Sequence, residues 1–188
     1  MIAGREIVVG VSGGIAAYKA AALTSLLVQE GAHVTAVLTR NARRFVGAAT
    51  FAALTGRPVA SRSFDANAFP LGAHIELAAK ADLVVVAPAS ADLLAKAAAG
   101  AADDLLTTLL LCAECPVLLA PAMNAAMWEK PAVQRNVRQV AADGGIIVQP
   151  GTGWLSCRRQ GTGRMAEPLE IVAAIRDALA ARPRPTSP

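Results

Sequence analysis

Five short runs of apolar residues alternate with helix-like segments along this chain of 188 residues, and this alternation limits the possible folds more than any other feature. The runs cover residues 5–11, 32–39, 81–88, 115–121 and 144–150. They are apolar on both faces, which is typical of strands in a parallel sheet that helices cover on both sides. The sequence therefore predicts a single-domain, three-layer α/β/α fold with a Rossmann-like or flavodoxin-like parallel sheet.

Segments with helical patterning lie between these runs, and one more follows the last run. They cover residues 15–30, about 42–54, 92–99 with 103–112, 130–142 and about 168–181, with a short helix after His74. Residues 61–73 form a long connection with little pattern. We expect one domain over residues 1–181. The tail over 182–188, RPRPTSP, is too rich in proline to pack, and we expect it to be disordered.

Composition narrows the functional class. The net charge is +4, but only 17% of residues are charged and no long basic run occurs, which argues against a nucleic-acid partner. Apolar residues make up 54% of the chain, many of them alanine, so we expect a homo-oligomer that buries the surplus apolar surface. Two histidines without clustered carboxylates predict no metal site.

The three cysteines also bear on compartment and chemistry. Cys112 and Cys115 have CxxC spacing, but no second pair or nearby histidine accompanies them. A helix end that leads into a strand is therefore the favoured interpretation of CAEC. The odd cysteine count, the lack of a signal peptide and the lack of an apolar run long enough to span a bilayer predict a cytoplasmic protein without a membrane partner.

Ligands of open α/β sheets bind beyond the carboxyl ends of the strands. After the first strand comes GVSGGIAAYK (10–19), where Ser12 and the free N–H groups of a new helix can hold a phosphate. The spacing matches neither a P-loop nor GxGxxG, and a glycine turn without a ligand is the alternative. Thr39 and Arg40 end the second strand without an acidic residue for a ribose, which favours a mononucleotide over a dinucleotide.

Later strand ends carry further candidates. Ser90 follows the third strand and either caps the next helix or lines a ligand site. Asn124 follows the fourth strand, where orienting a carboxylate and capping a helix are equally good interpretations. His74 is by itself a weak signal. Cys157 lies in GTGWLSCRRQGTGRM, a glycine-framed basic stretch that suits neither a helix nor a buried strand, so its thiol is not there for packing.

Together these motifs resemble the homo-oligomeric flavin-containing cysteine decarboxylases. The matching stretches run from about residue 5 to 180 and are GVSGGIAAYK, GAHIELA, ADLVVVAPASADLLAKAAAGAADDLLTT, PAMNAAMW and the CxxxGxGRMAEP of the late cysteine stretch. The resemblance implies a subunit that binds FMN between subunits of a trimer or a dodecamer. It is strongest to the branch that decarboxylates 4'-phosphopantothenoylcysteine, a small-molecule substrate, in coenzyme A biosynthesis.

The resemblance also implies roles for individual residues. Ser12 and neighbouring backbone hold the FMN phosphate, His74 is the active-site histidine, Asn124 binds the substrate carboxylate, and Cys157 is the late proton donor. The positions implied for FMN are Ser12, Gly13, Gly14, Ile15, Thr39, Ala87, Ser90, Ala91, Asp92 and Met123. Those implied for the substrate are Asn124, Met127, Arg158 and Arg164.

The implied reaction oxidises the cysteinyl side chain to a thioaldehyde, releases CO2 and then reduces the ene-thiolate, so that no external reductant is needed. Two alternatives remain open: a peptidyl-cysteine decarboxylase, and a non-catalytic FMN-binding regulator. One departure from the family pattern stands out, because members often have Cys-Gly-Asp where this chain has Cys157-Arg158-Arg159.

Overall fold

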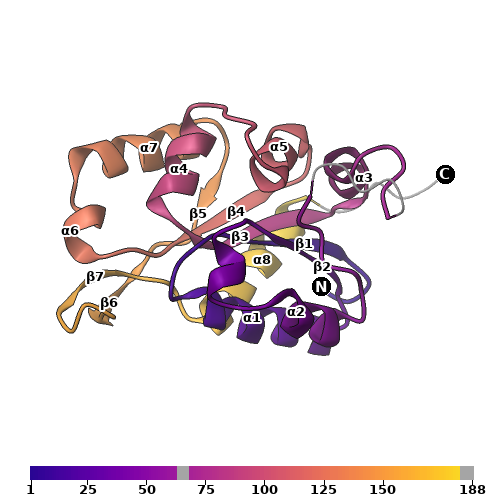
Figure 1. Ribbon diagram of the computed structural model, residues 1–188, viewed down its shortest axis with the longest axis horizontal. Helices are drawn as coiled ribbons and strands as arrows, with labels where there is room; N and C mark the ends of the chain where they lie inside the picture. Colours follow the sequence, from indigo (N-terminus) through magenta and orange to yellow (C-terminus); the bar gives the residue numbers. More distant parts are fainter. Residues whose placement is uncertain (63–67, 183–188) are drawn as a thin grey trace.

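A five-stranded parallel sheet forms the centre of the computed structural model, which describes residues 1–62 and 68–182 (Figure 1). Its strands are β1 (Glu6–Val11), β2 (His33–Leu38), β3 (Leu83–Ala89), β4 (Val117–Pro121) and β5 (Ile146–Ile147). They lie in the order β2-β1-β3-β4-β5, and every pair is parallel. The predicted three-layer, flavodoxin-like α/β fold is therefore confirmed.

Helices cover both faces of this sheet, as Figure 1 shows. One face carries α1 (Ala17–Gln29), α2 (Ala48–Thr55) and α8 (Pro168–Ala181), with the short 3-10 helix η1 (Ala42–Arg44) beside them. The other carries α3 (Ala73–Lys80), α4 (Ala91–Ala98), α5 (Leu105–Cys112) and α7 (Pro131–Ala142). The one-turn helix α6 (Ala125–Trp128) follows β4. All seven residues of β3 are buried because two apolar layers enclose the strand.

The structure departs from the expected elements in three places. The helix expected over 42–54 is divided into η1 and α2, because Gly47 is extended, with φ −73° and ψ 153°, and starts α2 as its N-cap. The last strand shortens to the two residues of β5. The late cysteine stretch forms an antiparallel hairpin of β6 (Gly151–Trp154), which is mostly exposed, and β7 (Gln160–Arg164), which is partly buried. Apart from Arg182, the tail expected over 182–188 lies outside the described residues.

The order of the strands reverses between β1 and β3, which places a topological switch point there. The turns that follow these two strands are tied together by Ser12. Its hydroxyl donates to the carbonyl oxygen of Pro88 at 2.8 Å and accepts from the backbone N–H of Ser90 at 2.9 Å. The two turns therefore form one rigid floor at the carboxyl edge of the sheet.

Candidate functional site

Two adjoining cavities open at the carboxyl edge of the sheet and share Gly13, Ser90, Ala91 and Met127. The inner cavity measures about 450 Å³ and the outer cavity about 820 Å³. Ten of the predicted site residues line the inner cavity: Gly13, Gly14, Ile15, Ser90, Ala91, Met123, Asn124, Met127, Cys157 and Arg164. Ser12, Thr39 and Asp92 line the outer one. Most of the residues that the motifs single out therefore surround one continuous space.

The turn between β1 and α1 leaves backbone donors unused. Among the described residues, no acceptor pairs with the N–H groups of Gly13, Gly14 or Ile15, which line the inner cavity. A Cβ at Gly13 would lie 2.5 Å from the Cβ of Asn41, so the turn packs too closely there for a side chain. A Cβ at Gly14 would meet nothing within 4 Å. The space beside Gly14 is thus open to a ligand, and free N–H groups at the start of a helix suit an anion.

Ser12 has less freedom than the sequence suggested. Only 2% of its surface is exposed, and its hydroxyl is already engaged with Pro88 and Ser90. Ser90 both lines the cavities and caps α4, since its hydroxyl accepts from the N–H of Leu93 at 3.3 Å. Both side chains position the turns, and the free backbone N–H groups are the stronger candidates for holding an anion.

Asn124 also combines two roles. Its side-chain oxygen accepts from the N–H of Ala126 at 2.8 Å and so caps α6, while the residue lines the inner cavity. The cap uses the oxygen and fixes the side chain, which leaves the amide NH2 without a partner among the described residues. An amide donor held in this way suits a carboxylate oxygen.

The hairpin that carries Cys157 is fastened to the Asn124 loop. The N–H of Met123 donates to the carbonyl of Gly163 at 2.9 Å. A Cβ at Gly163 would lie 2.5 Å from the carbonyl oxygen of Met123, and one at Gly161 would lie 2.7 Å from the Cβ of Ala125. The two glycines of QGTGR therefore let β7 approach the loop closely, so Asn124 and the base of the hairpin form one unit.

At its tip the hairpin turns tightly. The N–H of Leu155 donates to the carbonyl of Arg159 at 2.8 Å, and the N–H of Arg158 donates to the carbonyl of Leu155 at 2.9 Å. Arg158 adopts a φ of 62°. Cys157 is exposed and reaches the rim of the inner cavity, whereas Arg158 is exposed and lines neither cavity.

Sequence reasoning missed an ion pair between Glu167 and a buried lysine in the wall of the inner cavity, Lys19. Lys19 on α1 is only 6% exposed. Its ammonium donates to the carbonyl of Met165 at 3.2 Å and to Oε1 of Glu167 at 2.9 Å. Hydrogen bonding from Lys19 is the main cause that lowers the pKa of Glu167 below its ordinary value. A lysine among the apolar, core-facing positions of α1 was the signal available in the sequence.

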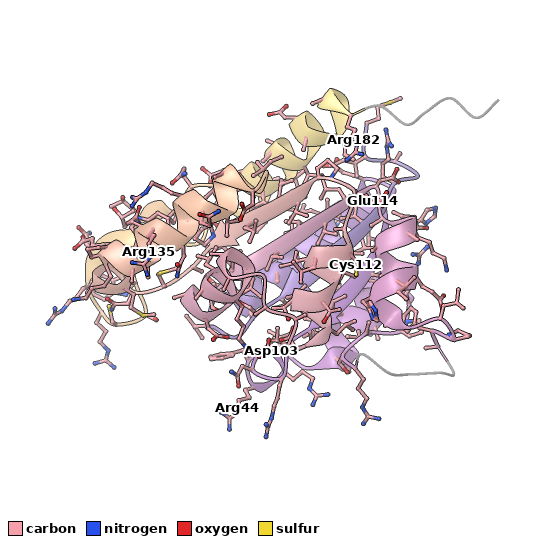
Figure 2. All side chains as sticks on the ribbon, turned by 90° about the horizontal axis from the view of Figure 1, so that it is seen from above. Arg44, Asp103, Cys112, Glu114, Arg135 and Arg182 are labelled. Carbon is pink, nitrogen blue, oxygen red and sulfur yellow. The ribbon has the colours of Figure 1, made fainter. Side chains whose placement is uncertain are left out.

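Charges of both signs line the outer cavity. The ammonium of Lys96 lies 2.8 Å from Asp103 and 3.3 Å from Asp92, and the Asp103 contact is the first cause that raises the pKa of this lysine. Arg40 and Arg44 line the same cavity. Figure 2 shows Arg44 and Asp103 at one edge of the molecule. Since Lys96 is neutralised by its partners, the two arginines supply the positive charge of this cavity.

Three predicted residues lie outside both cavities: His74, Ala87 and Arg158. Ala87 is fully buried in β3 behind the site. His74 lies in the first turn of α3, far across the molecule from α6 and the hairpin in Figure 1. Its Nδ1 atom is buried and has no hydrogen-bond partner among the described residues. One copy of the chain thus separates His74 from Asn124 and Cys157.

The CxxC pair lies at the opposite edge of the sheet. Cys112 ends α5 and Cys115 precedes β4, as expected for a helix end that leads into a strand. Both thiols are free, and burial raises the pKa of Cys115. Figure 2 shows Cys112 with Glu114 and Arg182 at this edge. In residues 1–62 and 68–182, no group of three or more His, Cys, Asp or Glu is placed to hold a metal ion, and no helix is long and apolar enough to cross a membrane.

Comparison with known proteins assigns the family. The family model described as Flavoprotein matches residues 1–180, and the chain belongs to this family. Among curated relatives, the coenzyme A biosynthesis bifunctional protein CoaBC of Mycobacterium tuberculosis (strain ATCC 25618 / H37Rv) is 52% identical over 168 residues, which is 89% of this chain and 40% of the relative. The same protein of Bacillus subtilis (strain 168) is 47% identical over 172 residues, which is 92% of this chain and 42% of the relative. The chain thus spans less than half the length of these relatives.

Solved structures extend the comparison. The FMN-dependent cysteine decarboxylase SpaF is 36% identical, with a TM-score of 0.81 over 96% of this chain and 98% of that one. A cysteine-to-serine variant of a PPC decarboxylase, complexed with pantothenoylaminoethenethiol, is 31% identical, with a TM-score of 0.81 over 92% of this chain and 97% of that one. These findings confirm the resemblance to the flavin-containing cysteine decarboxylases.

Proposed function

We propose that this chain binds FMN and decarboxylates 4'-phosphopantothenoylcysteine to 4'-phosphopantetheine, a carboxy-lyase reaction of coenzyme A biosynthesis. One observation carries the proposal: the cavity that begins at the free N–H groups of Gly13, Gly14 and Ile15 continues without a break to Asn124 and Cys157. Close likeness to the decarboxylase region of CoaBC and to a PPC decarboxylase supports it.

The residues present fit FMN. The free N–H groups of the β1–α1 turn suit its phosphate, and the open space at Gly14 leaves room for it. The small residues around Ser90 and Ala91 let a flat ring lie against backbone, with Met123 and Met127 as apolar walls. Bound FMN supplies a two-electron acceptor that takes electrons from the cysteinyl side chain and returns them after CO2 has left.

The other side chains act on the substrate. The amide of Asn124 donates to the departing carboxylate and holds it in one orientation while its own cap on α6 keeps it rigid. Arg164 supplies positive charge near this carboxylate or near the substrate's phosphate. Cys157 at the cavity rim gives a proton to the ene-thiolate carbon after CO2 is lost. Arg158 lies next to it outside the cavity, so its proposed contact with the substrate's phosphate requires a substrate that extends past the rim.

His74 enters the site from a second copy of the chain. Its distance from Cys157 within one copy, and its unpaired buried Nδ1, favour an interface that brings α3 of one subunit to the cavities of another. Residues 1–181 act as one flavoprotein domain, and the active assembly is a homotrimer or a dodecamer built from trimers.

The first experiment tests cofactor and substrate together. Purified protein is expected to be yellow, to release FMN on denaturation and to release CO2 from phosphopantothenoylcysteine. In the Cys157→Ser variant CO2 is still lost, but an oxidised enethiol accumulates because the last proton donor is missing. Protein that neither carries nor takes up FMN would overturn the proposal.

A peptide with a carboxy-terminal cysteine is the second candidate substrate. Trp154, which lines the inner cavity and is 63% exposed, favours it, since an open apolar rim suits a peptide. Comparing CO2 release from such a peptide and from phosphopantothenoylcysteine under the same conditions decides between the two reactions.

A further inference from the structure

Glu167 holds two cations that line the inner cavity, although it does not line the cavity itself. One of its oxygens, Oε1, accepts from Lys19 Nζ at 2.9 Å and from Arg164 Nη2 at 2.7 Å. No Asp or Glu lines this cavity among the described residues, so Lys19 and Arg164 give it a positive lining. The carboxylate of Glu167 therefore orients both cations from outside the cavity.

The guanidinium of Arg164 is held from two sides. Glu167 is its only hydrogen-bond partner among the described residues, so its remaining N–H donors are free. On the other side the side chain lies over Gly153 of β6, where a Cβ would be 3.3 Å from Nη1 and 3.6 Å from Cδ. A fork of donors held in this way suits a carboxylate or a phosphate group, which it can bind through two oxygens.

Lys19 fixes the position of the Glu167 carboxylate. Because it is buried, its ammonium needs a compensating charge, and Glu167 is the acid that provides it. The second bond of Lys19, to the carbonyl of Met165, fixes the chain between Arg164 and Glu167 against α1. The carboxylate is therefore held where it can orient Arg164 without entering the cavity.

We infer that Glu167 is a positioning residue, which acts through Arg164 to set the site that recognises an anionic group of the substrate. This inference rests on the proposed decarboxylation. Since the anion that Arg164 contacts is already fully charged in the bound substrate, before the bond breaks, the Glu167 side chain acts mainly on KM and little on kcat.

The test is a double-mutant cycle on the FMN-loaded protein with phosphopantothenoylcysteine as substrate. We expect Glu167→Gln to raise KM by about 10- to 100-fold, the scale of a displaced binding group, with kcat within about threefold. In an Arg164→Ala background the same change is expected to alter KM less than about threefold, because its effect passes through Arg164. An equal rise in KM in the wild-type and Arg164→Ala backgrounds would overturn the inference.

Glu170→Ala is the matched control. Glu170 accepts from the backbone N–H of Glu167 at 2.7 Å and so belongs to the same helix start, but among the described residues it forms no ion pair with Lys19 or Arg164. This variant is expected to lower Tm and leave KM unchanged. If it raises KM as Glu167→Gln does, Glu167 acts only by capping α8, and the inference fails.

Glu167→Asp keeps the charge and shortens the side chain, so it tests the inference even if Glu167→Gln is isolated in poor yield. It is expected to raise KM less than Glu167→Gln does; a rise equal to or above that of the glutamine variant contradicts the inference.

Substrate without its phosphate identifies the anion: the effect of Glu167→Gln on KM disappears if Arg164 binds the phosphate and persists if it binds the carboxylate. Wild-type protein that releases no CO2 would overturn the proposed function, whereas an active wild type with additive variants would overturn only the role of Glu167.

Discussion

Arg158 is the one described residue other than glycine with a positive φ, at 62°. An L-residue with a side chain meets a steric cost in this region that glycine does not. The position is also the one where family members often have glycine after the cysteine. The chain thus keeps a backbone shape suited to glycine at the tip of the hairpin and adds a positive charge beside Cys157.

We therefore predict that Arg158→Gly stabilises the protein by about 1 kcal/mol, since it relieves the left-handed strain. Chemical denaturation of the two proteins measures the difference. Arg159→Gly is the control, because Arg159 does not have a positive φ and glycine there only adds backbone entropy to the unfolded chain. A loss of stability in Arg158→Gly would contradict the strain argument.

Among the elements, the pairing of the β6–β7 hairpin with the Asn124 loop matters most for the site. Its closeness depends on Gly163, which has a φ of 133° and where an added Cβ would lie only 2.5 Å from the Met123 carbonyl oxygen. Any side chain there must push the hairpin away from Asn124. A glycine thereby sets the distance between the Asn124 amide and the hairpin that carries Cys157.

Gly163→Ala is expected to lower the free energy of unfolding by about 1–3 kcal/mol and to reduce product formation more than FMN binding. Gly151→Ala on the paired strand is the control, since its Cβ would meet only the carbonyl oxygen of Arg164, at 4.0 Å. Thermal unfolding, FMN titration and CO2 release, measured on both variants, separate the effects on stability, FMN binding and product formation. Equal behaviour of the two variants would show that the close approach is unimportant.

An ion pair links β1 to the segment after α2. The Arg57 guanidinium donates to both oxygens of Glu6, at 2.6 and 3.0 Å, and this hydrogen bonding is the main cause that lowers the pKa of Glu6 below its ordinary value of 4.5. A carboxyl with a lowered pKa in the folded state stabilises the fold fully above its unfolded pKa. That stabilisation is lost as pH falls through the folded-state pKa.

The wild type is therefore expected to lose stability below about pH 4.5 more steeply than Glu6→Gln does. Both side chains are about one third exposed, so the pair contributes only about 0.5–1 kcal/mol at neutral pH. Tm measured from pH 7 to pH 3 gives the two curves. Parallel curves would mean that Glu6 does not contribute to the acid sensitivity.

For the whole molecule, the position of His74, far from α6 and the hairpin, supports the proposal that more than one chain forms each site. If the site combines His74 of one subunit with Asn124 and Cys157 of another, two inactive variants can complement each other. His74→Asn and Asn124→Asp suit this test, because aspartate keeps the oxygen that caps α6.

Mixed oligomers formed by coexpressing the two variants are expected to recover about one quarter of wild-type activity, since random assembly pairs an intact His74 with an intact Asn124 at about one site in four. CO2 release from the copurified mixture measures this recovery. Each variant alone is the control. No recovery in oligomers shown to contain both chains would place the whole site in one subunit.

The sequence predicted the sheet well because its strands are buried on both faces and therefore continuously apolar, as in LVVVAPA of β3. It did not predict the hairpin, because GTGW and QGTGR are rich in glycine and lack apolar alternation. The turn residues around Gly13 and Asn124 could be found from their place after strands. Glu167 could not, since its partner Lys19 is brought to it only by the packing of α8 on α1.

The hydrogen bond from Lys19 to the carbonyl of Met165 joins residues 146 positions apart in the sequence. Both residues line the inner cavity. During synthesis from the amino terminus, the sheet strands β1 to β4 leave the ribosome well before Met165 does. The inner cavity therefore cannot close until nearly the whole chain has emerged. Uptake of the cofactor is then a late event in biogenesis, and the yellow colour of the protein reports that the carboxy-terminal part has folded onto the rest.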